Sequence, residues 1–234
     1  MLSRRLFCGC LAGLAFTATA ARAQVMEACE VVTDEAQKST SPDMALAALR
    51  AGNERVLKGK SANCDRAAQV KATAKDQNPF AAILGCIDSR VAPELVFDQH
   101  IGDIFAARVA GNISNVDIIG SLEYATKVAG ARAIVVLGHT GCGAIKAAVD
   151  HVKLGNITAL LKNIDPALKA VGTVSGRNDS TNLDLVHKVT EANVRLTAES
   201  LVKRSKIIKT MVDTGELKIA GAVHDVGTGK VTWL

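Results

Sequence analysis

Residues 80–90 read Phe-Ala-Ala-Ile-Leu-Gly-Cys-Ile-Asp-Ser-Arg, so an unbroken apolar run leads directly into a cysteine, an aspartate and an arginine. A short apolar run without polar alternation is typical of a strand covered on both faces, as in a mainly parallel sheet. Three further runs of strand length occur at residues 104–109, 133–137 and 217–223. The stretch therefore predicts one strand of a parallel sheet, with reactive side chains at its carboxyl end.

Helical patterns lie between these runs, at residues 116–128 and 144–152 and over the long stretch 183–212. Alternation of strands and helices predicts an α/β fold with a mainly parallel central sheet flanked by helices. Before the first strand we expect an N-terminal helical extension. One of its helices begins at Ser41-Pro42 and ends before Gly59, and a second lies near residues 65–75.

The totals fit one compact domain with a substantial core, since the 234 residues are 48% hydrophobic and 22% charged. The glycine- and serine-containing stretch 174–180 is short and is interpreted as a loop, so residues 24–234 form a single domain. The chain has 28 basic and 23 acidic residues, and three of the arginines lie in the leader described next. The small remaining surplus gives no electrostatic case for binding nucleic acid.

Residues 1–23 are predicted to be a signal peptide. They contain the basic pair Arg4-Arg5, an apolar run that extends to Ala21, and a small-x-small cleavage site that ends at Ala23. The alternative is an uncleaved membrane anchor, but the run is shorter than the roughly 20 apolar residues that span a bilayer. The basic pair also resembles a twin-arginine signal, and both export routes remain open. We therefore expect a periplasmic or secreted mature chain that begins near Gln24.

The six cysteines fall into three groups: Cys8 and Cys10 in the leader, Cys86 and Cys142 in the motifs below, and Cys29 and Cys64. In an oxidising compartment the last two form an even pair, which predicts a Cys29–Cys64 disulfide. The alternative is two unpaired thiols, because the sequence does not give the distance between their Cα atoms.

A second reactive segment follows the apolar run 133–137 and reads Gly138-His-Thr-Gly-Cys-Gly143. The carboxyl ends of parallel strands generally hold the ligands of open α/β sheets, so neighbouring strands would bring Cys86 together with His139 and Cys142. Two thiolates and an imidazole suit zinc, and three protein ligands leave a fourth position for water. The alternative for Cys86 alone is a small core residue. Taken together, the residues predict a catalytic metal site with one Zn²⁺ per chain.

These motifs, Cys86-x-Asp88-Ser89-Arg90 and His139-x-x-Cys142-Gly143, resemble the signature of the β-class carbonic anhydrases. The resemblance covers roughly residue 44 to the C-terminus and includes segments 102–105, 110–112, 121–125 and 221–225. It implies a Rossmann-like sheet and zinc held by Cys86, His139 and Cys142. It also implies a homodimer or higher homo-oligomer, with active sites near the subunit interface.

The function implied is reversible hydration of carbon dioxide to bicarbonate and a proton by a zinc-bound hydroxide. We assign Asp88 to orient that hydroxide and Arg90 to keep Asp88 ionised by a charge-assisted pair. The family pattern places Gln77, Phe105 and Tyr124 around the substrate. Without the resemblance, Phe105 and Tyr124 would be interpreted as core residues.

The glycine at position 143 fits the same scheme, because a residue without a side chain lets substrate approach the metal. The mature chain is therefore expected to take a small-molecule substrate, carbon dioxide or bicarbonate, with no nucleic acid and no membrane as partner. These expectations concern one site, built from the two motifs.

Three other functions remain open from the sequence. The first is a zinc hydrolase of carbonyl sulfide or carbon disulfide on the same scaffold, and the second is a non-catalytic zinc-binding protein. The third is a thiol-redox protein, against which the absence of a Cys-x-x-Cys pair counts.

Overall fold

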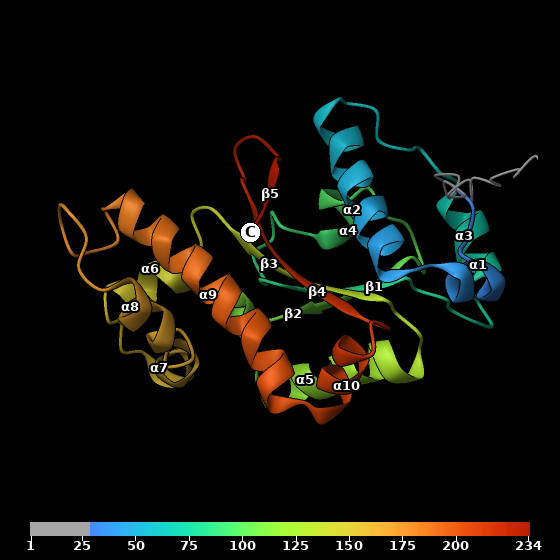
Figure 1. Cartoon of the computed structure of the whole chain (residues 1–234). Coiled ribbons are helices and arrows are strands. Elements are labelled where there is room, and N and C mark those ends of the chain that lie inside the picture. Colours follow the sequence, from blue (N-terminus) through green and yellow to red (C-terminus); the bar gives the residue numbers. More distant parts are fainter. Residues whose placement is uncertain (1–28) are drawn as a thin grey trace, which may run out of the picture.

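The computed structural model describes residues 29–234, so the predicted signal peptide lies outside the described residues. Five strands form one sheet in the order β2-β1-β3-β4-β5 (Figure 1). They are β1 Ala81–Gly85, β2 Ile104–Arg108, β3 Ala133–His139, β4 Lys218–His224 and β5 Val231–Trp233. The first four are mutually parallel, and β5 is antiparallel to β4. The predicted mainly parallel α/β sheet is confirmed, whereas the short β5 was not predicted.

The helices of the described chain are α1 Asp34–Ser39, α2 Pro42–Leu57, α3 Arg66–Ala72, α4 Pro93–Val96, α5 Val116–Glu123, α6 Gly143–Val149, α7 Gly155–Leu161, α8 Asp165–Val171, α9 Leu183–Arg204 and α10 Lys206–Asp213. A short 3-10 turn covers Ala110–Asn112, and a π-helical turn over Tyr124–Val128 continues α5. None of these helices is long and apolar enough to cross a membrane. The patterns at 116–128 and 144–152 are confirmed as helices, while α1, α4, α7 and α8 were not predicted.

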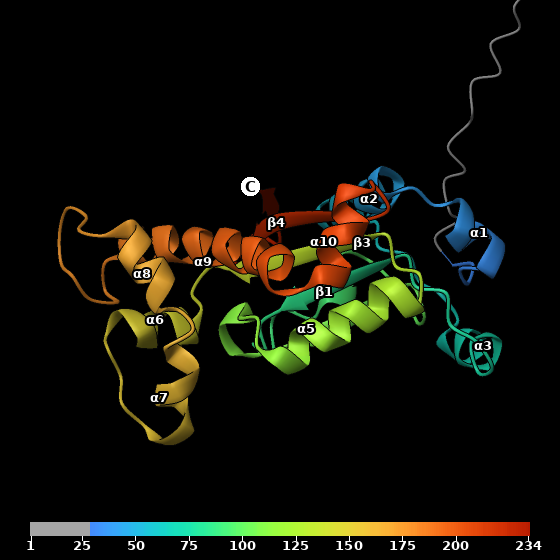
Figure 2. The ribbon, with the colours of Figure 1, turned by 60° about the horizontal axis from the view of Figure 1, so that its bottom comes forward.

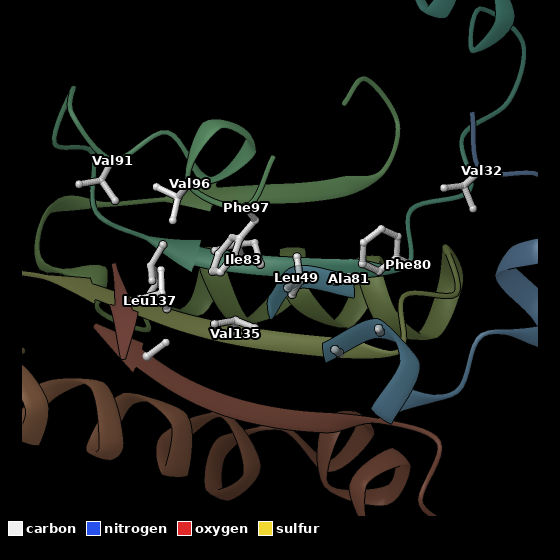
Figure 3. Close-up of a cluster of buried hydrophobic side chains, with 14 residues drawn as sticks. Val32, Leu49, Phe80, Ala81, Ile83, Val91, Val96, Phe97, Val135 and Leu137 are labelled. Atoms are coloured by element: carbon white, nitrogen blue, oxygen red, sulfur yellow. The ribbon is translucent and has the colours of Figure 1, made fainter. Parts of the chain in front are cut away.

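Both faces of the sheet are covered, which explains why the strands read as unbroken apolar runs. On one face Ile83 and Val135 pack with Leu49 of α2 (Figure 3). On the opposite face Leu84 and Val136 pack against α5, α9 and α10. Figures 1 and 2 show α2 and α5 on opposite sides of the sheet. Alternate residues of each strand thus enter two separate cores, and neither core tolerates a polar side chain.

The N-terminal extension contains the two predicted helices, and a polar side chain caps each of them. The Ser41 hydroxyl accepts a hydrogen bond from the amide of Met44 at 3.2 Å, and α2 begins at the next residue. The Asp65 carboxylate caps α3 through the amide of Ala68 at 3.0 Å. This helix ends at Ala72, earlier than the predicted boundary at residue 75, where the Thr73 hydroxyl donates to a carbonyl of the preceding turn.

The long pattern at residues 183–212 forms two helices instead of one. Ser205 separates α9 from α10 with extended backbone angles of φ −115° and ψ 115°. Its buried hydroxyl accepts from the amide of Ile208 at 3.0 Å and donates to the Glu123 carboxylate at 2.5 Å. A serine that caps the next helix competes with helix continuation, and hydrophobic periodicity does not register that competition.

Beyond the carboxyl edge of the sheet, α6 and α8 pack against the first half of α9, and α7 packs against α6. Their shared core contains Ile145, Ile164 and Val186, and Cys86 and Cys142 are buried in the same cluster. The stretch 174–180 lies in the loop between α8 and α9, as predicted. This layer gives the carboxyl edge an apolar wall.

The predicted Cys29–Cys64 disulfide is present, with a Cα–Cα distance of 5.3 Å and a sequence separation of 35 residues. It ties the start of the described chain to the segment that precedes α3. Cys29 itself lies outside the cores, whereas Val32, three residues later, is buried in the core that contains Leu49, so the bond and Val32 together hold the N-terminal segment.

Removing this disulfide should destabilise the fold without altering the sheet. Cys29→Ser is expected to lower the free energy of unfolding by about 3 to 4 kcal/mol, since the bond closes a loop of intermediate length in the unfolded chain. Urea unfolding monitored by circular dichroism measures the change. Cys64→Ser should cause the same loss, and a reductant should shift the midpoint of the wild type only. An unchanged midpoint in Cys29→Ser would contradict the stabilising role.

Candidate active site

The two reactive segments meet because β1 and β3 pair directly. Gly85, the last residue of β1, is in register with Leu137 of β3. Cys86 therefore comes next to the end of β3, whose last residue is His139. Cys142 follows three residues later and precedes α6. The ligand atoms of Cys86, His139 and Cys142 all lie within 4.8 Å of one another, and the two sulfurs are 4.0 Å apart. The predicted juxtaposition of the three residues is confirmed.

The imidazole of His139 is oriented for ligation. It is fully buried, and its Nδ1 lies 3.0 Å from the Thr140 carbonyl oxygen, which can only accept a hydrogen bond. The proton is therefore on Nδ1, and the lone pair of Nε2 faces the two sulfurs. Nε2 is buried and has no hydrogen-bond partner among the described residues. A metal-ligating histidine typically shows this arrangement, with the second ring nitrogen bonded to a carbonyl.

The two thiols are electrostatically coupled. A hydrogen bond from the Cys142 thiol lowers the pKa of Cys86, and the amide of Gly111 donates to the same sulfur at 3.4 Å. The hydrogen bond to Cys86, together with burial, raises the pKa of Cys142. A divalent cation that prefers sulfur and nitrogen would stabilise both thiolates, so the donor set fits zinc.

The residues around Cys86 leave little freedom in the backbone. Gly111 has a positive φ of 71°, and a Cβ at this position would lie 3.0 Å from Ile164 and 3.3 Å from Ala144. Asn193 of α9 donates to the Gly111 carbonyl at 2.8 Å. Only glycine fits this conformation and space at the same time, and its amide is thereby held against the Cys86 sulfur.

Asp88 and Arg90 form the predicted ion pair. The carboxylate accepts from Arg90 Nε at 3.0 Å and from Nη2 at 2.8 Å, and from the Arg90 amide at 3.0 Å. These hydrogen bonds from Arg90 hold the pKa of Asp88 well below its usual range. One carboxylate oxygen also lies 3.9 Å from His139 Nε2. An ionised acceptor is therefore fixed beside the three ligands.

Among the predicted substrate residues, Gly143 lies at the cluster, and the other three do not. Gly143 is the first residue of α6. Phe105 lies near the start of β2 and is in register with Ala82, four residues before Cys86. At strand spacing this is about 13 Å along the sheet.

The other two residues lie with Phe105. The Tyr124 ring packs edge-on against the Phe105 ring at 6.3 Å, and the exposed Gln77 precedes β1. Within one chain these three residues occupy the amino end of the sheet, opposite the thiols. Their assignment to the substrate pocket stays a prediction.

Sequence reasoning missed one side chain at the site. Arg108, the last residue of β2, donates to the carbonyls of Cys86 and Asp88. The available signal was an arginine at the end of an otherwise apolar strand. Its relation to Cys86 depends on the pairing of β1 with β2, which spacing along the chain does not reveal.

The fold and the site together define an α/β protein in which two cysteines and one histidine at the carboxyl edge of a parallel sheet could hold a metal ion. Residues 81–231 match the family model described as carbonic anhydrase. Carbonic anhydrase 2 of Mycobacterium tuberculosis is 35% identical over 193 residues, which cover 82% of this chain and 92% of the relative. The carbonic anhydrase of Mycolicibacterium smegmatis is 32% identical over 199 residues, with coverage of 82% and 93%.

Solved structures agree with this result. The β-carbonic anhydrase of Coccomyxa in complex with acetazolamide has a TM-score of 0.64 and 26% identity, and the match covers 81% of this chain and 84% of that one. A β-carbonic anhydrase of Aspergillus fumigatus has a TM-score of 0.65 and 25% identity, with coverage of 81% and 89%. The chain belongs to the β-carbonic anhydrases, and it is a carbonic anhydrase lyase.

Proposed function

We propose that the mature chain catalyses the reversible hydration of carbon dioxide with one zinc ion held by Cys86, His139 and Cys142. The observation that carries the proposal is the buried His139 Nε2, which lies within 4.8 Å of two sulfurs and has no hydrogen-bond partner among the described residues. Zinc bound there would supply hydroxide at near-neutral pH by lowering the pKa of its water from 15.7 to about 7. Three protein ligands leave that position free.

Asp88 is proposed to orient the attacking oxygen by accepting its hydrogen bond. Its low pKa means that the carboxylate is ionised throughout the neutral range, so it acts as an acceptor and does not store the proton. The bidentate contact with Arg90 holds the carboxylate in a single orientation beside His139. Because the carboxylate accepts the hydrogen of the attacking oxygen from a fixed direction, a lone pair of that oxygen would be directed at the substrate carbon.

Gly143 supports substrate access to the site. Its backbone does not need glycine, because its φ is not positive, and a Cβ at this position would meet no atom within 4 Å. Neither conformation nor packing therefore accounts for the missing side chain. Open space next to the ligand Cys142 is consistent with a path for a small, linear molecule.

We further propose that a second subunit completes the substrate pocket. Gln77, Phe105 and Tyr124 are too far from the thiols of their own chain, but they lie on a face that a partner can cover. A groove of about 710 Å³ runs between β2 and α5 and is lined in part by Phe105 and Tyr124. Two of the side chains that line this groove are largely exposed, Val116 by 73% and Tyr124 by 51%. The strand β2 also lies at the edge of the sheet. Burial against a second copy of the chain would therefore cover both the exposed apolar side chains and the unpaired strand edge.

The compartment is proposed to be the periplasm or the outside of the cell. The predicted signal peptide motivates this proposal, and the Cys29–Cys64 disulfide supports it, because such bonds persist in oxidising compartments. The thiols of Cys86 and Cys142 would remain reduced there when zinc occupies both.

Stopped-flow hydration of carbon dioxide tests the proposed reaction. The purified mature chain should hydrate carbon dioxide rapidly with one zinc per chain, and acetazolamide should inhibit it. Cys86→Ser should lose both the metal and the rate, since a serine hydroxyl is a poor ligand for zinc. The matched control is Cys29→Ser, which should retain both. One zinc per chain in the wild type without hydration would overturn the proposal.

Analytical ultracentrifugation tests the proposed subunit contact. The wild type should sediment as a dimer or larger species. Val116→Glu should shift it toward a single chain and abolish hydration while zinc remains bound, because a charge then occupies the contact face. Leu183→Glu is a control of similar exposure, at 71% against 73%, on another surface and should change neither property. A wild type that hydrates carbon dioxide as a single chain would contradict completion by a partner.

A further inference from the structure

Arg108 crosses from one strand to the loop that follows its neighbour. It is the last residue of β2 and is in register with Gly85, the last residue of β1. Its half-buried side chain passes the end of β1 and donates from Nε to the Cys86 carbonyl at 2.9 Å. From Nη2 it donates to the Asp88 carbonyl at 2.7 Å. One guanidinium therefore binds the main chain on both sides of Ile87.

The segment that Arg108 binds lies between two buried residues, Cys86 and Val91. Strand pairing stops at Gly85, and the Ile87 side chain is 59% exposed, so Ile87 itself gives the loop no core contact. Val91 donates its amide to the Asp88 carbonyl at 3.0 Å from the far side of the turn. The thiol of Cys86 and the carboxylate of Asp88 nevertheless need fixed positions relative to His139, which belongs to a different strand.

We propose that Arg108 is a positioning residue that sets the placement of the Cys86 thiol and the Asp88 carboxylate at the metal site. The inference rests on the proposed function. Two arginines then share the control of Asp88: Arg90 binds the carboxylate, and Arg108 binds the carbonyl. Arg90 approaches from solvent and is 54% exposed, so its ion pair alone gives a weaker restraint than an anchor on the backbone.

The chemistry of the side chain explains the need for arginine. Two carbonyls separated by one residue require two donors in a planar, fixed arrangement, which the guanidinium provides. A lysine at this position keeps the positive charge and reaches one carbonyl, and it leaves the other without its charge-assisted hydrogen bond. Arg108→Lys therefore separates the effect of the two planar hydrogen-bond donors from the effect of the positive charge.

The test compares Arg108→Lys with Arg55→Lys in the full mature chain. Arg55 is a matched control because its guanidinium also anchors a loop, through the side chain and the carbonyl of Asp98, away from the thiols. Arg108→Lys should reduce kcat for hydration by about 10- to 100-fold, the range typical of second-layer contacts at metal sites, with KM changed less than about twofold. Its zinc should pass to a chelator about tenfold faster. Arg55→Lys should lower the urea midpoint and leave kcat and zinc release unchanged.

A double-mutant cycle identifies the residue through which Arg108 acts. In an Asp88→Asn background, Arg108→Lys should reduce kcat by less than about threefold further, because the positioned carboxylate is already lost. Zinc release should still accelerate, since that effect passes through Cys86. If Arg108→Lys does not fold, Arg108→Gln replaces it in the comparisons of kcat and zinc release, because the glutamine side chain has a single amide nitrogen as donor.

The outcomes separate this inference from the proposed reaction. Equal kcat in Arg108→Lys and the wild type would overturn the positioning role of Arg108. The same holds if the losses of kcat in Arg108→Lys and Asp88→Asn are fully additive. A wild type that binds zinc but does not hydrate carbon dioxide would refute the proposed function instead. In that case the rate of zinc release still decides whether Arg108 positions Cys86.

Discussion

The parallel pairing of β1 with β3 is the contact on which the site depends. Register between Gly85 and Leu137 brings Cys86 beside His139, although 53 residues separate them in the sequence. A shift by one residue would turn every side chain of β1 to the opposite face and remove its match with one of the two cores. The alternating burial of Ile83 and Leu84 therefore fixes the register that brings the ligands together.

Around the ligands, the electrostatics favour negative charge at defined atoms. The amide of Gly111 donates to the Cys86 sulfur, and Arg90 and Arg108 both lie beside Asp88. These donors are fixed by the backbone of neighbouring elements, so little reorganisation is needed when a cation binds. The apolar layer formed by α6, α7 and α8 covers the thiols and lowers the local dielectric constant. This combination matches a reaction that develops negative charge on oxygen next to a metal.

Much of this arrangement could be predicted from the sequence, since apolar runs identify buried strands and their ends identify the ligands. Four strands, the helix start at Ser41-Pro42, and the meeting of Cys86 with His139 and Cys142 were all predicted from pattern and chemistry. Short elements were missed because they lack periodicity: β5 has three residues, and α4 has four.

Other features depend on three-dimensional contacts that spacing cannot reveal. Ser205 breaks a continuous helical pattern because its hydroxyl bonds to Glu123, which lies 82 residues earlier. Arg108 reaches Cys86 only through strand register. Phe105 and Tyr124 carry the family's pocket pattern, yet a single chain places them at the opposite end of the sheet. The proposed role in the substrate pocket would require a surface that belongs to another molecule.

In the proposed site, Cys86, His139 and Cys142 bind a single zinc, with one position left for solvent. X-ray absorption at the zinc edge of the purified mature chain measures this directly. The prediction is two sulfur ligands at about 2.3 Å, one nitrogen at about 2.0 to 2.1 Å, and one further light atom. A shell of four sulfurs, or one without sulfur, would contradict the proposed site.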